Sequence, residues 1–180
     1  MGEWKVRKHG AGKHRTWMKM HVVMDAKSQQ IKGVRLTPNS EDDSTGATPL
    51  IASNKYKVGS PRDDGAYDKH AFRKLLKQKE MCQIIQPQSN AENNNSRLPH
   101  LRERNRTVKR IGRIGRKKWK EQNGYHQRSK IETAMFRYKM IIGDHLAARK
   151  NSHHETEVAI GCKILNVMLQ VAKLISIKVS

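Results

Sequence analysis

Apolar and polar side chains alternate in the first part of the chain, which predicts a strand with one apolar face. A polar turn at 27–30 separates this strand from a second apolar run at 31–36, so the two segments predict a β-hairpin. The alternation covers residues 16–25, where the apolar positions of one face are Met18, Met20, Val22 and Met24.

The middle of the chain predicts shorter elements. Turn-forming residues fill 37–54, which indicates loop or a short helix, and 56–59 is a weak strand candidate. The apolar spacing over 69–79 predicts a helix with Asp68 as its N-cap, and a short strand is expected at 82–85.

The pattern changes to polar loop and basic segment after the predicted strand at 82–85. Residues 86–100 form a low-complexity polar loop. Residues 102–122 are basic and poorly amphipathic, and Gly112 and Gly115 are expected to weaken any helix there. Trp119, inside this segment, is expected either to stack on a base or to anchor the segment to the core.

Two helices are expected near the C-terminus. One runs from about 125 to 142, and the other starts near Ser152, with Glu155 completing a capping box. Strands first and helices later indicate an α/β or α+β fold. We expect one domain over 1–150, with 151–180 packing on it as a C-terminal helix. The apolar face of that last helix consists of Val158, Cys162, Leu165, Met168, Leu169 and Ala172.

The charge balance points to a polyanionic partner. The 180 residues include 37 Lys and Arg against 16 Asp and Glu, a net charge of +21. Residues 97–150 alone carry 17 basic and 4 acidic side chains, while six acidic groups cluster between 41 and 68. Basic blocks on both sides of an acidic cluster suit a site that binds phosphate at its walls and metal at its centre.

Several protein classes are excluded by what the sequence lacks. No apolar run approaches the ~20 residues of a membrane span, and no secretory h-region follows Met1. Cys82 and Cys162 match no zinc or redox spacing, which favours two reduced thiols in a cytoplasmic protein.

Four side chains with phosphate or metal chemistry share one side of the predicted helix at 125–142. At about 100° per residue, Tyr125, Arg128, Glu132 and Lys139 fall within a stripe of about 60°. The stripe borders the side expected to be buried, which consists of Ile131, Met135, Tyr138 and Ile142. The alternative interpretation is a surface ion-pair network, which contributes only tenths of a kcal/mol per pair.

The spacing Tyr-x2-Arg-x3-Glu-x6-Lys resembles the signature of bacterial insertion-sequence transposases with a DDE catalytic domain. Three other blocks resemble the same group, in the same order along the chain: Glu3-Trp4-Lys5-Val6-Arg7-Lys8-His9-Gly10, Asp64-Gly65-Ala66-Tyr67-Asp68 and Thr156-Glu157-Val158-Ala159-Ile160-Gly161-Cys162.

The resemblance implies an RNase H-like α/β fold that cleaves phosphodiester bonds and joins the freed 3′ end to target DNA. It makes Asp64 and Glu132 the second and third catalytic carboxylates, which would hold two Mg²⁺ or Mn²⁺ ions. Tyr125, Arg128 and Lys139 would orient and neutralise DNA phosphates. The implied partners are duplex transposon ends and target DNA in the bacterial nucleoid, together with the missing N-terminal half or a full-length transposase.

The chain departs from the family at three places. The first catalytic Asp and its strand are missing upstream of Glu3, and Asp25 does not replace it, so the fold is expected to be incomplete and the isolated chain inactive. Pro61 and Arg62 stand where the family has apolar strand residues, just before Asp63, which is an alternative to Asp64 as a ligand. Phosphate binding by the loop at 86–91 is not expected, because the family's basic residues are absent there.

Two other functions remain open from the sequence. One is a non-catalytic basic nucleic-acid-binding protein, and the other is a metal-dependent nuclease of related fold. A metal-dependent cleavage assay distinguishes the non-catalytic binding protein from either enzyme, because only an enzyme yields cleaved DNA. Strand-joining products separate a transposase from a nuclease.

Overall fold

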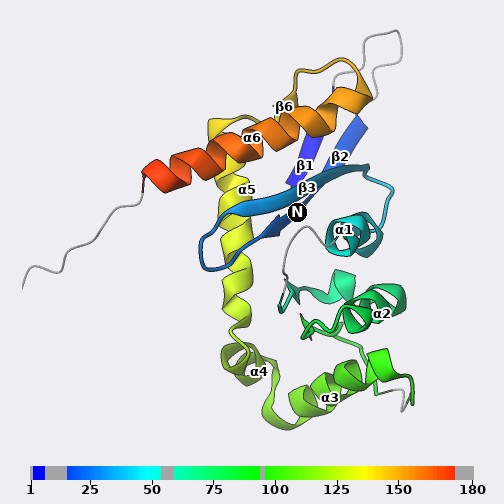
Figure 1. Ribbon diagram of the computed structural model, residues 1–180. Coiled ribbons are helices and arrows are strands. Elements are labelled where there is room, and N and C mark those ends of the chain that lie inside the picture. The colour runs from blue at the N-terminus through cyan, green and yellow to red at the C-terminus, as the bar shows by residue number, and fades with distance from the viewer. Residues whose placement is uncertain (1, 7–15, 54–58, 94–95, 173–180) are drawn as a thin grey trace, which may run out of the picture. The chain divides into compact units, whose positions relative to one another are not determined.

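The computed structural model describes residues 2–6, 16–53, 59–93 and 96–172 (Figure 1). The chain divides into two compact units. Unit 1 consists of Met1–Asn39 and Lys130–Ser180, and unit 2 consists of Ser40–Ser129. Both helices and strands occur, so the fold is mixed α/β, as expected.

Unit 1 contains a four-stranded sheet in the order β3-β2-β1-β6. The predicted hairpin is confirmed, because β2 (Thr16–Met24) and β3 (Ile31–Pro38) pair antiparallel. Two further strands were not expected from the pattern. These are β1 (Gly2–Val6), antiparallel to β2, and the short β6 (His145–Leu146), parallel to β1.

Asp25 forms the turn of this hairpin. Its Oδ1 accepts hydrogen bonds from the backbone N–H groups of Lys27 and Ser28, each at 2.7 Å. These bonds hold the pKa of Asp25 below its usual value. The side chain is therefore engaged locally in an exposed turn, which agrees with leaving Asp25 out of the catalytic set.

Two helices cover the sheet of unit 1: α5 (Ser129–Ile141) and α6 (Asn151–Val171). The ring of Tyr138 lies directly against Gly161, where any Cβ would overlap the phenol. The expected capping box is wrong. Lys150 is the N-cap of α6 without a side-chain bond, and Glu155 instead accepts the N–H of Leu36 at 3.2 Å. The core of unit 1 consists of Met20, Ile31, Leu36, Met135, Tyr138, Leu146, Val158, Cys162 and Leu165.

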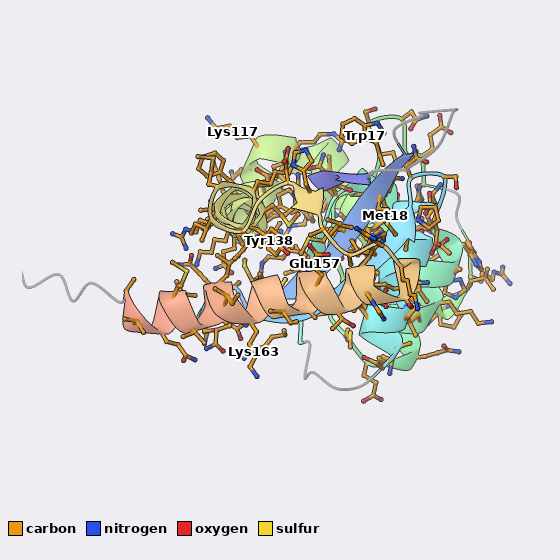
Figure 2. All side chains as sticks on the ribbon, turned by 90° about the horizontal axis from the view of Figure 1, so that it is seen from above. Trp17, Met18, Lys117, Tyr138, Glu157 and Lys163 are labelled. Carbon is orange, nitrogen blue, oxygen red and sulfur yellow. The ribbon has the colours of Figure 1, made fainter. Side chains whose placement is uncertain are left out.

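The apolar face expected for α6 is only partly correct. Val158, Cys162 and Leu165 are buried as predicted, but Met168 is 44% exposed and Ala172 is also exposed. Lys163 points away from the rest of unit 1 (Figure 2). Among the described residues, no helix is both long enough and apolar enough to cross a membrane.

Unit 2 is built from helices and one two-stranded parallel sheet. The sheet pairs β4 with β5, and the buried residues around it include Phe72, Leu76, Ile85 and Leu101. The elements in chain order are α1 (Asp43–Ala52), β4 (Arg62–Asp63), the 3₁₀ turn η1 (Gly65–Tyr67), α2 (His70–Gln78), β5 (Ile84–Ile85), α3 (Pro99–Ile114), α4 (Arg116–Gln122) and the 3₁₀ turn η2 (Tyr125–Arg128). The weak strand expected at 56–59 lies outside the described residues except for Gly59.

The basic segment is more helical than its glycines suggested. Gly112 lies inside α3 with open space around it, and Gly115 ends α3 at a φ of +78°. A positive φ is a conformation that glycine adopts without strain, so Gly115 separates two helices rather than abolishing them. Trp119 on α4 is 3% exposed and packs against Tyr125, so it anchors the segment and is not available to stack on a base.

Candidate active site

Asp64 directly follows the carboxyl end of β4. It begins η1, and its Oδ1 accepts the N–H of Ala66 at 3.0 Å. The side chain is 40% exposed. One carboxylate oxygen is therefore fixed by the turn, and the carboxylate is accessible to solvent.

The 3₁₀ turn η2 places two of the predicted site residues next to Asp64. Nη1 of Arg128 lies 3.5 Å from Oδ2 of Asp64, and the Tyr125 hydroxyl donates to the backbone carbonyl of Asp63 at 3.2 Å. Gly124, at a φ of +58°, turns the chain into η2. Tyr125 is buried, so its hydroxyl holds the end of β4.

Asp63 differs from Asp64 in environment. Its Oδ2 is buried and makes no hydrogen bond. Burial and the neighbouring Asp64 together raise the pKa of Asp63 to about 7, and the positive charge of Arg128 opposes the shift. Successive strand residues point to opposite sides, so of this acidic pair Asp64 is the one accessible to a ligand.

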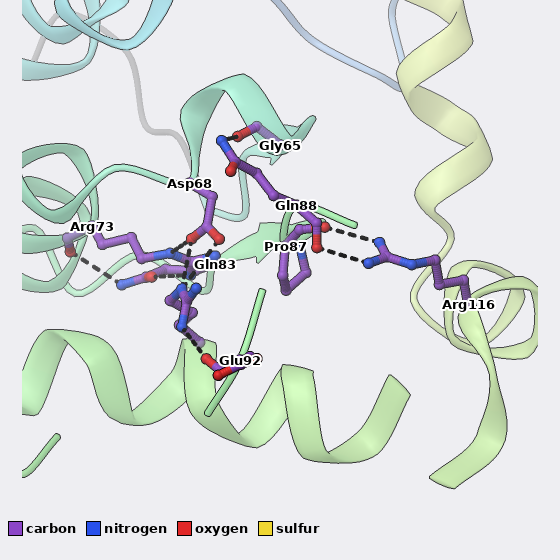
Figure 3. A network of polar contacts seen from close by, with 9 residues as sticks. Gly65, Asp68, Arg73, Gln83, Pro87, Gln88, Glu92 and Arg116 are labelled. Carbon is purple, nitrogen blue, oxygen red and sulfur yellow. Dashed lines mark hydrogen bonds and ion pairs between the residues drawn. The ribbon is translucent and has the colours of Figure 1, made fainter. Parts of the chain in front are cut away.

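Asp68 is not the helix cap that the sequence suggested. Lys69 occupies the N-cap of α2, and Asp68 is buried in an ion cluster (Figure 3). It accepts from Nε of Arg73 at 2.6 Å and from Nε of Arg104 at 3.1 Å. Arg73 also donates to Gln83 at 2.9 Å, next to β5. The cluster thus fastens α2 and α3 to the strand pair that carries Asp64.

The loop that follows β5 contacts the turn at Gly65 through Gln88 (Figure 3). A Cβ at Gly65 would meet the side chain of Gln88 at 3.3 Å, so glycine permits this close approach. Arg116 holds the loop by donating to the carbonyls of Pro87 at 2.9 Å and Gln88 at 2.7 Å. These contacts join segments far apart in the chain, so no local periodicity predicts them.

Glu132 and Lys139 belong to unit 1. Both are exposed on α5, seven residues apart, and therefore lie on nearly the same side of that helix. The inner side of α5 carries the buried Met135 and Tyr138, as predicted. The single helix expected over 125–142 is wrong, because Tyr125 and Arg128 lie in a 3₁₀ turn before α5 begins.

The four-residue stripe required one continuous α-helix, so it does not exist in that form. Instead the structure brings Asp64, Tyr125 and Arg128 together within unit 2, and it places Glu132 and Lys139 on α5 of unit 1. The residues of the signature are thus divided between the two units.

The chain matches the family model described as "Transposase DDE domain" over residues 2–167. It belongs to the DDE transposase domain family. No solved structure matches the chain, so the RNase H-like arrangement expected for this family stays a prediction.

DDE transposase domains generally use divalent metal ions. The donors near β4 fit such ions in kind, because Asp63 and Asp64 offer hard carboxylate oxygens and the buried Oδ2 of Asp63 has no partner. Within the described residues, however, no group of three His, Cys, Asp or Glu side chains comes together to hold a metal. In this DDE transposase domain, the described residues of unit 2 thus offer carboxylate donors beside β4 but no assembled metal site.

Proposed function

We propose that this domain carries the DNA cleavage and strand-transfer chemistry of DNA transposition. The observation that carries the proposal is the contact between Asp64 and Arg128, which joins two separate family motifs at one strand end. Membership of the DDE transposase domain family supports it. Its substrates are duplex transposon ends and target DNA in the bacterial cytoplasm and nucleoid.

The proposed roles follow from the chemistry of each side chain. Asp64 and Glu132 are the carboxylates that would hold Mg²⁺ or Mn²⁺. Two such ions, when bound, help to activate an attacking oxygen and stabilise a leaving one at phosphorus. Arg128 and Lys139 neutralise phosphate oxygens near the bond that is cut.

Tyr125 acts through the backbone in this proposal. Its hydroxyl holds the carbonyl of Asp63, one residue before Asp64, and its ring packs on Trp119. Tyr125 is thus a positioning residue that fixes the direction of the Asp64 carboxylate. Asp63 is the second-choice ligand, because its Oδ2 is buried and its raised pKa, about 7, makes the ionised form less favoured than in Asp64's exposed setting.

A strand-transfer assay tests this function. The purified 180-residue chain is incubated with pre-cut ends of the element that encodes it, supercoiled target DNA and Mg²⁺ or Mn²⁺. We expect no joined products from this chain alone, because the family-matched residues supply two carboxylates of the three in the DDE set. Joined products should require the family's upstream segment, fused or added in trans, and should vanish with Asp64→Asn or Glu132→Gln.

The outcomes separate the rival functions. Cleavage without joining would indicate a metal-dependent nuclease. DNA binding without any metal-dependent product, even with the upstream segment present, would indicate a non-catalytic nucleic-acid-binding protein. Joined products from the 180 residues alone would show that their metal site is complete.

A further inference from the structure

Four cations share one side of α3 in unit 2. At about 100° per residue, Arg102, Arg106, Lys109 and Arg113 fall within a sector of about 60°. All four side chains are exposed. We call these four residues the α3 stripe.

The packing of α3 fixes the direction of the stripe. Leu101 and Asn105 are buried, and they lie about 90° around the helix from the centre of the stripe. These residues occupy the side of α3 that packs within unit 2. The α3 stripe is therefore held towards solvent by the packing that buries Leu101 and Asn105.

Among the residues that the structure describes, no carboxylate pairs with the stripe. Glu103 is the only acidic residue of α3, and its Oε1 accepts the N–H of Gln83 at 3.1 Å. Within the part of the chain that the structure describes, the four stripe cations make no hydrogen bond or ion pair. Arg104 and Arg116, by contrast, are engaged in internal contacts. Arg104 and Arg116 therefore have structural roles, whereas the four stripe cations are available to a ligand.

Like charges four residues apart destabilise a helix. Arg102 with Arg106, and Lys109 with Arg113, are two such pairs. Lys117 on α4 adds to the exposed positive charge of the segment and extends away from the ribbon (Figure 2). A polyanion that binds along this row of cations reduces the repulsion between them.

We propose that the α3 stripe binds the phosphate backbone of duplex DNA, outside the residues assigned to the reaction. The inference rests on the proposed function for the identity of the polyanion. The stripe spans about 16 Å along the helix axis, and a duplex carries about one negative charge per 1.7 Å of its axis. Each cation therefore has phosphates within its reach.

The chemistry of the stripe favours duplex DNA over two other polyanions. Single-strand sites stack bases on aromatic side chains, and the stripe has none, while Trp119 is buried. Membrane-surface helices insert an exposed apolar face, whereas on α3 Leu101 is buried and Val108, Ile111 and Ile114 are half-buried. The stripe offers charge alone, which suits the backbone of a duplex.

A pair of charge-matched triple variants tests the proposal. R106Q/K109Q/R113Q removes three stripe cations, and K74Q/K77Q/R97Q removes three exposed cations elsewhere in unit 2. Fluorescence anisotropy with a labelled duplex, in chelator and between about 50 and 200 mM salt, gives affinity and salt slope. The slope should fall by about 0.9 per lost contact, hence about 2.7 for the stripe triple, and little for the control.

Equal losses from both triples would show that only overall charge matters and would overturn the proposal. A stripe triple that loses affinity for single strands or for anionic vesicles, but keeps its affinity for the duplex, would overturn it as well. Circular dichroism verifies that both variants are folded. Because the assay contains no metal and scores no joining, its result is independent of the strand-transfer test.

Discussion

Nη1 of Arg128 lies 3.5 Å from Oδ2 of Asp64, so a 3₁₀ turn and a strand end that are far apart in the chain meet at one carboxylate. The two side chains are 31% and 40% exposed. Water screens such a pair, so its attraction adds little to the stability of the fold. The contact instead keeps a guanidinium beside a carboxylate where both are accessible to solvent.

Removing Arg128 should therefore affect DNA more than folding. Arg128→Ala is expected to change the free energy of unfolding by no more than about 1 kcal/mol, since the pair is partly exposed. Duplex affinity should fall, as it should for Lys139→Ala. Denaturant unfolding and anisotropy measure the two effects. Arg97→Ala is the control for an exposed arginine in unit 2, and a collapse of stability with intact affinity would make Arg128 structural.

Asp68 should behave as a buried charge and not as a helix cap. Asp68→Asn leaves the guanidinium of Arg73, itself 1% exposed, without its counter-charge. Breaking a buried pair from one side costs about 3–5 kcal/mol, whereas loss of a cap costs about 1 kcal/mol. Thermal unfolding measures the difference. D68N/R73M should recover part of the loss, and a loss near 1 kcal/mol without recovery would restore the capping interpretation.

Two glycine-to-alanine changes should shift the stability of the fold in opposite directions. In Gly161→Ala the new Cβ overlaps the Tyr138 ring between α5 and α6, and such overpacking costs about 1–3 kcal/mol. Gly112→Ala places the same methyl group in open space inside α3 and should stabilise the helix by about 0.5–1 kcal/mol. Melting temperatures of the two variants test this. Equal effects would show that Tyr138 does not pack on Gly161 in solution.

The local pattern predicted the elements whose partners lie nearby in sequence. The alternating methionines predicted the strand that the structure has as β2, and the helical spacing of Met135 and Tyr138 predicted the buried side of α5. The strands β1 and β6 were missed because their parallel pairing joins Lys5 to His145 and Val6 to Leu146, which are far apart in the chain, and β6 is only two residues long. No local signal encodes such a pairing.

The candidate site was predicted from motifs more than from periodicity. The motifs named Asp64, Tyr125 and Arg128, which the structure then places together in unit 2. They did not reveal that the helix changes from 3₁₀ to α between Arg128 and Ser129. Over four residues, these two helix types differ by only a fraction of a turn. Nor did the motifs reveal Arg104 as a partner of Asp68, since that contact depends on how α3 packs.

The histidine pair between α2 and α3 should make unit 2 sensitive to acid. Nε2 of His100 lies 2.8 Å from Nε2 of His70, a geometry in which one ring donates and the other accepts. Burial lowers the pKa of His100 below its usual value of 6.5, and the charges of His70 and Lys74 lower it further. The neutral form is therefore favoured in the folded state.

The sign of the pH effect follows from linkage. Because the folded-state pKa of His100 is lower than its unfolded value, its contribution to stability is full above about pH 6.5 and is lost as the pH falls through the lowered pKa. His100→Gln should flatten the decline in melting temperature between about pH 7 and pH 5, while His126→Gln, at an exposed position, should leave it unchanged. A decline that is the same in all three proteins would show that the acid sensitivity arises elsewhere in the chain.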